Sequence, residues 1–186
     1  MEADFWKHEL SANDVRRQSL DDLKYISFVA EPFFPINLLD AESCSTFLSN
    51  HPEVKDFLSR FLFLEQQKIV NLTEYTNTDL KYKYGVANLP ALTEYDSNYN
   101  ELITLLNNYG AILENDGYET QALTVLEYAV SIGSDISTTY LLCAKIYQNN
   151  KQWNELDQLK REAEIISTSR RDSIVRKLQE FGPYNG

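Results

Sequence analysis

Residues 103–136 read ITLLNNYGAILENDGYETQALTVLEYAVSIGSDI, and residues 137–170 repeat their pattern of small and bulky side chains. Gly110 aligns with Ala144, and Leu113 aligns with Tyr147, at the same separation in the chain. Two helices cross closely only where small residues lie at the crossing, while bulky residues fill the flanking space. The pattern therefore predicts pairs of antiparallel helices that stack in chain order.

A period of about 34 residues with paired helices is typical of tetratricopeptide repeats. The first unit, residues 103–136, matches that pattern well. The second unit, residues 137–170, matches less well, because Lys160 and Leu156 stand where the pattern favours an apolar and a small residue. The alternative is a generic array of helical hairpins that matches the period by chance. Residues 173–181 follow as an amphipathic closing helix.

We therefore predict a mainly α fold made of tetratricopeptide-like antiparallel helical hairpins, with about two repeats plus a C-terminal cap helix. An irregular, partly helical N-terminal region precedes them. The predicted boundary gives residues 1–88 to this N-terminal region and residues 89–186 to the helical domain. Because two repeats leave apolar outer faces, the helix that contains Phe57 and Phe61 and the extended aromatic segment before it are candidates to cover them.

Local signals give the N-terminal region its predicted elements. Residues 5–23 are expected to form one short helix anchored by Phe5 and Trp6. Residues 24–39 follow as an extended aromatic segment, from which Pro32 and Pro35 exclude a continuous helix. Asp40 is a candidate N-cap for a helix over residues 40–50, and a second helix is expected to start near Pro52. A third is expected to start at Thr76 or Asn77 and to stop at Gly85.

Composition argues against several classes of function. The 186 residues carry a net charge of −11, which disfavours nucleic acid as a partner. The two Cys and two His form no metal-binding spacing, and the six Gly form no phosphate-binding motif. We expect no cofactor, no metal site and no catalytic residue. An enzyme that uses carboxylates and tyrosines is the weaker alternative. Cys44 and Cys143 are expected to be buried thiols, with a disulfide as the alternative, and His8 and His51 to be solvated or capping residues.

Tetratricopeptide arrays bind peptides or partner helices in a groove lined by the first helix of each unit. Asn and Gln side chains can bond a peptide backbone through both a donor and an acceptor. The positions that would line such a groove here are Asn107, Asn108, Glu114, Asn115, Lys145, Gln148 and Asn149. The alternative for these residues is an ordinary solvated helix face.

The predicted function is a non-enzymatic protein–protein interaction module. Residues 101–150 carry six acids and one base, so a neutral to basic protein or peptide is the expected partner. The alternative is a structural subunit that self-associates through aromatic residues of the N-terminal half. The aromatic residues that favour this alternative are Phe33, Phe34, Phe61 and Phe63. The sequence does not specify the oligomeric state.

Four strings extend the comparison beyond the repeats: FWKHELSAN (5–13), LDDLKYI (20–26), KIVNLTEYTNTDLKYKYGVANL (68–89) and LTEYDSNYNELI (92–103). Together they resemble uncharacterised tetratricopeptide-repeat-like proteins of Gram-positive anaerobic bacteria. That resemblance implies an N-terminal membrane helix, which this chain lacks, followed by the helical domain. It therefore implies a cytoplasmic protein with two alternatives. Either the chain is anchored at the cytoplasmic face of the membrane by a helix that was removed, with Met1 as the introduced boundary, or this member is soluble and Met1 is its native start. The family carries no activity that could be transferred.

Overall fold

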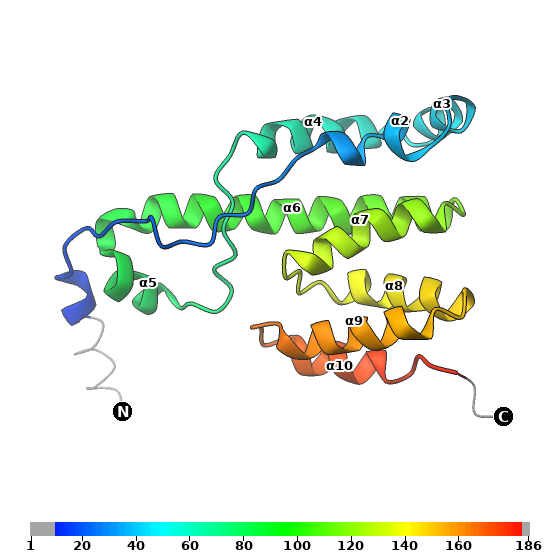
Figure 1. Ribbon diagram of the computed structural model, residues 1–186. Coiled ribbons are helices and arrows are strands. Elements are labelled where there is room, and N and C mark those ends of the chain that lie inside the picture. Colours follow the sequence, from blue (N-terminus) through cyan, green and yellow to red (C-terminus); the bar gives the residue numbers. More distant parts are fainter. Residues whose placement is uncertain (1–9, 184–186) are drawn as a thin grey trace. The chain divides into compact units, whose positions relative to one another are not determined.

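The computed structural model describes residues 10–183, and they are mainly helical, as predicted (Figure 1). In chain order the helices are η1 (Glu31–Phe33), α2 (Pro35–Leu38), α3 (Ala41–Asn50), α4 (Val54–Glu65), α5 (Asn77–Tyr84), η2 (Val86–Asn88), α6 (Leu89–Asn115), α7 (Glu119–Ser131), α8 (Ser137–Asn149), α9 (Trp153–Ile165) and α10 (Arg171–Leu178).

The chain forms two compact units that differ from the predicted division at residue 88. The first contains the described residues up to Ser27 together with Gln67–Asn100, and the second contains Phe28–Gln66 and the described residues from Glu101 onward. Helix α6 is 27 residues long and contributes its first part to one unit and its second part to the other. The predicted boundary falls at the start of this helix, whereas the two units divide within it.

The first unit has an apolar core and one short contact between extended segments. One cluster of buried residues in this unit comprises Leu23, Val70, Leu72, Leu80, Tyr84 and Leu92. Tyr25 and Val70 form an isolated antiparallel bridge, and the Ile26 amide donates to the Ile69 carbonyl at 2.9 Å. The buried side chain of Asn88 donates to the carbonyls of Gln18 and Tyr84. The first of these bonds joins the segment around Gln18 to η2, and the second joins η2 to the end of α5.

The predicted cap residues of α3 and α5 are confirmed. The Asp40 carboxylate accepts from the backbone amides of Glu42 and Ser43 at the start of α3. Thr76 and Asp79 form a reciprocal capping box at the start of α5. Gly85 ends that helix with a φ of +81°, which an L side chain adopts only at a cost.

In the second unit, α7, α8, α9 and α10 stack side by side and run in alternating directions (Figure 1). Helices α7 and α9 begin at Glu119 and Trp153, and α8 and α10 begin at Ser137 and Arg171, so both offsets equal the period of the sequence pattern. The turns repeat as well. Gly117 and Lys151 both have positive φ, and the following amides of Tyr118 and Gln152 donate to the carbonyls of Leu113 and Tyr147, five residues back in each case.

Aromatic side chains cover the outer face of the first helical hairpin, as predicted. The rings of Phe28 and Phe33 lie 6.0 Å and 5.1 Å from the ring of Tyr128 on α7. On the other side of this cluster, Phe47 of α3 and Phe61 of α4 each lie 6.3 Å from Tyr109 of α6. The helices α3 and α4 and the aromatic segment therefore complete the core of this unit.

The remaining N-terminal predictions have mixed outcomes. Pro32 and Pro35 interrupt the aromatic segment, which contains only the short helices η1 and α2. Phe5, Trp6 and His8 lie outside the described residues. Within them, residues 10–13 are helical and residues 15–20 are not, so a single helix over positions 5–23 is wrong.

Cys44 and Cys143 are both free and buried, so the disulfide alternative is wrong. Within residues 10–183, no helix has the length and apolar character that crossing a membrane requires.

Candidate functional site: the α6–α8 face

The predicted groove residues lie on two helices of the second unit. Asn107, Asn108, Glu114 and Asn115 occupy the second part of α6, and Lys145, Gln148 and Asn149 occupy the last two turns of α8. Both helices end at an Asn, and the two ends are separated by one period of the sequence pattern. Whether this face binds a partner stays a prediction.

Polar side chains join α6 to α8 at two levels. Near the start of α8, the hydroxyls of Thr138 and Thr139 both donate to Oδ1 of Asn107, at 2.9 Å and 3.0 Å. Two turns later, Lys145 Nζ lies 2.5 Å from Glu114 Oε1. Asn107, Glu114 and Lys145 are thus engaged in holding the two helices together. They set the spacing of the face.

The other asparagines of the face are open to solvent. Asn108, Asn115 and Asn149 are exposed. Asn108 accepts one hydrogen bond from the Asn107 amide at 3.2 Å, and this bond leaves the Asn108 amide nitrogen available as a donor. Gln148 is half-buried, and its Oε1 accepts from the backbone amide of Gly182 at 2.9 Å.

The acidic residues near this face are less available than the sequence indicated. Each of the six acids in residues 101–150 has a side-chain partner, and for three of them the partner is a Lys or Arg. The pairs are Glu101 with Arg60, Glu114 with Lys145, Asp116 with His51, Glu119 with Asn150, Glu127 with Tyr147, and Asp135 with Thr168 and Arg170. The three pairs with Lys or Arg reduce the attraction that this region exerts on a basic partner.

His51 links the α3–α4 turn to the α6–α7 turn. Its Nε2 lies 2.7 Å from Asp116 Oδ2, and its Nδ1 lies 3.3 Å from Glu53 Oε1. Desolvation lowers the pKa of His51, but the hydrogen bonds to Asp116 and Glu53 outweigh it, so this pKa is raised above its ordinary value. His51 is also the C-cap of α3, as the capping alternative predicted.

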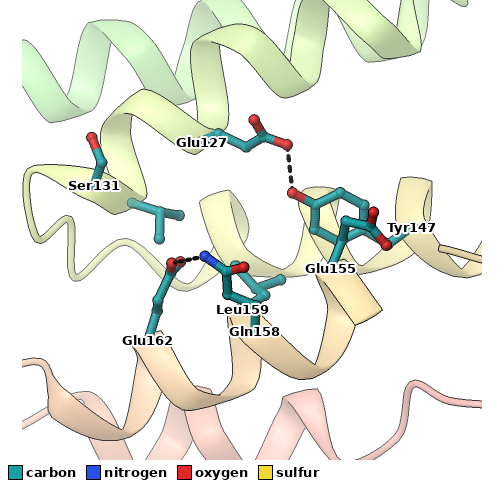
Figure 2. Close-up of a pocket in the computed structure, with 8 residues that line it drawn as sticks. Glu127, Ser131, Tyr147, Glu155, Gln158, Leu159 and Glu162 are labelled. Carbon is teal, nitrogen blue, oxygen red and sulfur yellow. Dashed lines mark hydrogen bonds between the residues drawn. The ribbon is translucent and has the colours of Figure 1, made fainter. Parts of the chain in front are cut away.

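A second feature, which the sequence reasoning missed, is a hollow of about 350 Å³ between α7, α8 and α9 (Figure 2). It is lined by Glu127, Val130, Ser131, Tyr147, Glu155, Gln158, Leu159 and Glu162. The Tyr147 hydroxyl donates to Glu127 Oε1 at 2.5 Å, and the Gln158 amide donates to Glu162 Oε1 at 2.9 Å. Both bonds are visible in Figure 2.

The chemistry of this hollow is acidic. Three of its lining residues are glutamates and none is basic. Burial and the hydrogen bond to Glu127 raise the pKa of the Tyr147 hydroxyl above its ordinary value, so Tyr147 remains a neutral donor. Within the described residues, no group of three or more His, Cys, Asp or Glu is placed to hold a metal ion. The hollow therefore favours cations only through its general charge.

A pattern in the sequence could have indicated one wall of the hollow. Glu155, Gln158 and Glu162 recur at intervals of three and four, so they share one face of α9. The opposite wall comes from α7, and its position depends on how α7 and α9 each pack against α8, which no local pattern in the sequence specifies.

The aromatic residues predicted to favour self-association differ in their exposure to solvent. Phe33 and Phe61 are buried in the core of their own unit, with 4% and 0% of their surface exposed. Phe63 is 46% exposed, and the Arg60 guanidinium lies 4.5 Å from its ring centroid. Two of the four aromatic residues are therefore not available on the surface.

Comparison of the chain with protein-family models, with curated proteins and with solved structures finds no significant match.

Proposed function

We propose that this chain is a non-enzymatic protein–protein interaction module that binds an extended peptide across the α6–α8 face. The observation that carries the proposal is the arrangement of exposed asparagines on two adjacent helices whose spacing is fixed by other side chains. A face of this kind offers donors and acceptors to a peptide backbone without a folding cost at the moment of binding.

We further propose that the second unit is tetratricopeptide-like. Three observations support this reading: the equal offsets between corresponding helices, the positive φ at both Gly117 and Lys151, and the burial of aligned residues. Gly110 and Ala144 are both buried, and so are Leu113 and Tyr147. In such arrays the first helices of successive units, here α6 and α8, line the binding surface.

The partner on this proposal is a protein segment that is neutral or weakly basic. The ion pairs of Glu114 and Glu101 offset part of the negative charge of residues 101–150, so hydrogen bonding to the backbone contributes to recognition beside net charge. Recognition by Asn and Gln side chains is compatible with many peptide sequences, because the backbone is common to all of them.

Affinity capture from a lysate of the source cells tests the proposal. The informative variant replaces Asn108, Asn115 and Asn149 together by alanine, because all three side chains are exposed and their loss leaves the core intact. A matched control replaces the exposed Thr120 of α7 and Asn154 of α9. A Lys145→Glu variant is unsuitable, because it would place a second carboxylate beside Glu114.

The expected result is a protein that the wild type and the control retain and that the triple variant loses, while all three proteins show the same helical circular-dichroism spectrum. Retention by the triple variant would refute the assignment of the face.

The bacterial resemblance also supports attachment of the module at the cytoplasmic face of a membrane. Fractionation of source cells tests this part separately. Recovery of the native protein with membranes is the expected outcome, and recovery only in the soluble fraction would contradict it.

A further inference from the structure

Helix α10 ends early, and the segment that follows it is held by side chains of two other helices. Helix α10 begins one period of the sequence pattern after α8, but it is five residues shorter. Helix α8 has 13 residues and ends at Asn149, whereas α10 has 8 residues and ends at Leu178. The residues at the end of the segment, Phe181 to Pro183, are neither helical nor strand.

Two hydrogen bonds fix the backbone of this segment. The Gly182 amide donates to Gln148 Oε1 at 2.9 Å, and the Phe181 carbonyl accepts from Lys160 Nζ at 2.8 Å. Gln148 belongs to α8 and Lys160 to α9, and both bonds are partly buried. Side chains from two helices thus bind one peptide group, Phe181 C=O and Gly182 N–H, from either side. A bound partner peptide would present the same two backbone groups.

The position of Gln148 connects this contact to the α6–α8 face. Gln148 lies one turn after Lys145 on the same face of α8, and Lys145 is paired with Glu114 of α6. The exposed Asn149 is its neighbour in the chain. The tail therefore lies at one end of the face that is proposed to bind a partner.

The side chains of the tail show what the site accepts. Phe181 is half-buried, whereas a Cβ added at Gly182 would meet nothing within 4 Å. The site thus holds an aromatic residue followed by a residue whose side chain is not restricted.

We propose that residues 181–183 are a resident occupant of a peptide-backbone site formed by Gln148 and Lys160, and that an extended partner segment with an aromatic residue displaces them. This inference rests on the proposed function, because it identifies one end of the same binding face. A tethered tail competes at an effective concentration in the millimolar range, so it weakens binding without blocking it.

The experiment uses the full chain and a synthetic probe peptide, LQEFGP, which copies residues 178–183 and is capped at both ends. The probe is titrated into ¹⁵N-labelled protein, and the amide signals of α8 and of the Gln148 side chain are followed by NMR. Gly182→Pro removes the amide hydrogen that Gln148 accepts and so releases the tail. Gly182→Ala keeps that hydrogen and is the matched control, because the added Cβ lies in open space.

We expect Gly182→Pro to bind the probe about tenfold more tightly than the wild type or Gly182→Ala. Adding Gln148→Leu to Gly182→Pro removes the acceptor and should abolish binding, whereas adding Gln148→Glu keeps an oxygen and should preserve it. Equal binding by wild type and Gly182→Pro would overturn the competition. Failure of Gly182→Pro to bind, or binding that survives Gln148→Leu, would overturn the site.

The probe carries the sequence of the chain itself, so this result does not depend on finding a partner. The probe can bind as expected while affinity capture retains no partner that depends on Asn108, Asn115 and Asn149. In that case the peptide site is supported and the proposed function of the whole face is refuted.

Discussion

The close crossing of α6 and α7 at Gly110 makes the sharpest stability prediction. A Cβ placed on Gly110 would lie 2.5 Å from both Cγ and Cδ2 of Leu126, whose side chain is fully buried. Real carbon atoms do not approach so closely, so Gly110→Ala must shift Leu126 or separate the helices. Overpacking of this kind costs about 1–3 kcal/mol, and the short distance to Cγ favours the upper end of the range.

Helix propensity acts in the opposite direction. Alanine is favoured over glycine inside a helix by about 1 kcal/mol. The net expectation is that Gly110→Ala lowers the free energy of unfolding by about 1–2 kcal/mol, the difference between these two terms. Urea unfolding followed by far-ultraviolet circular dichroism measures this change directly.

A double-mutant cycle separates the clash from other causes. Leu126→Ala alone should cost about 2–5 kcal/mol, because it leaves a cavity. The pair Gly110→Ala with Leu126→Ala should cost less than the sum of the two, by about 1–2 kcal/mol. Gly117→Ala is the control: its φ of +84° makes it cost about 1 kcal/mol with nothing nearby to clash, so it should show no coupling to Leu126. An unchanged or increased stability of Gly110→Ala, or additivity in the cycle, would refute the reasoning.

Three further predictions concern single groups. The buried Tyr109 hydroxyl has no hydrogen-bond partner among the described residues, so Tyr109→Phe should leave the urea midpoint unchanged or raise stability by about 1 kcal/mol, and a clear loss would contradict this. The pKa of His51 is raised in the folded state, so the contribution of protonated His51 to the free energy of unfolding is fully present below its ordinary pKa near 6.5 and is lost as the pH rises through the folded value. His51→Gln should therefore flatten the dependence of the free energy of unfolding on pH across neutral pH. An unchanged dependence on pH would count against the contacts with Asp116 and Glu53. Thr76→Val removes one half of the α5 capping box and should lower stability by about 1 kcal/mol, with faster amide exchange at the start of α5, whereas unchanged exchange would refute the role of the cap.

Much of the fold follows from local signals in the sequence. The caps Asp40, Thr76 and Gly85 mark helix ends, because their side chains or conformations satisfy backbone groups that the helix leaves unpaired. The small residue Gly110 indicated a helix crossing for a physical reason that the contact with Leu126 illustrates. Signals of this kind act within a few residues, so they can be read before the fold is known.

What could not be predicted depends on contacts between residues far apart in the chain. Helix α6 continues past Asn100, where the two compact units divide, because no Gly or Pro interrupts residues 91–109. At the candidate site, the sequence placed Glu114, Lys145 and Gln148 on one face but could not show their partners. Two of them pair with each other, and the third holds the backbone of Gly182.

The central claim is that the exposed asparagines of α6 and α8 bind a peptide backbone. Selection of a random peptide library against the full chain, followed by isothermal titration of the enriched peptides, tests this claim most directly. We predict that the enriched peptides bind the wild type and the Thr120→Ala, Asn154→Ala control equally, and bind the variant lacking Asn108, Asn115 and Asn149 at least about tenfold more weakly, a loss of about 1.4 kcal/mol. Equal binding to all three proteins, or no enrichment at all, would contradict it.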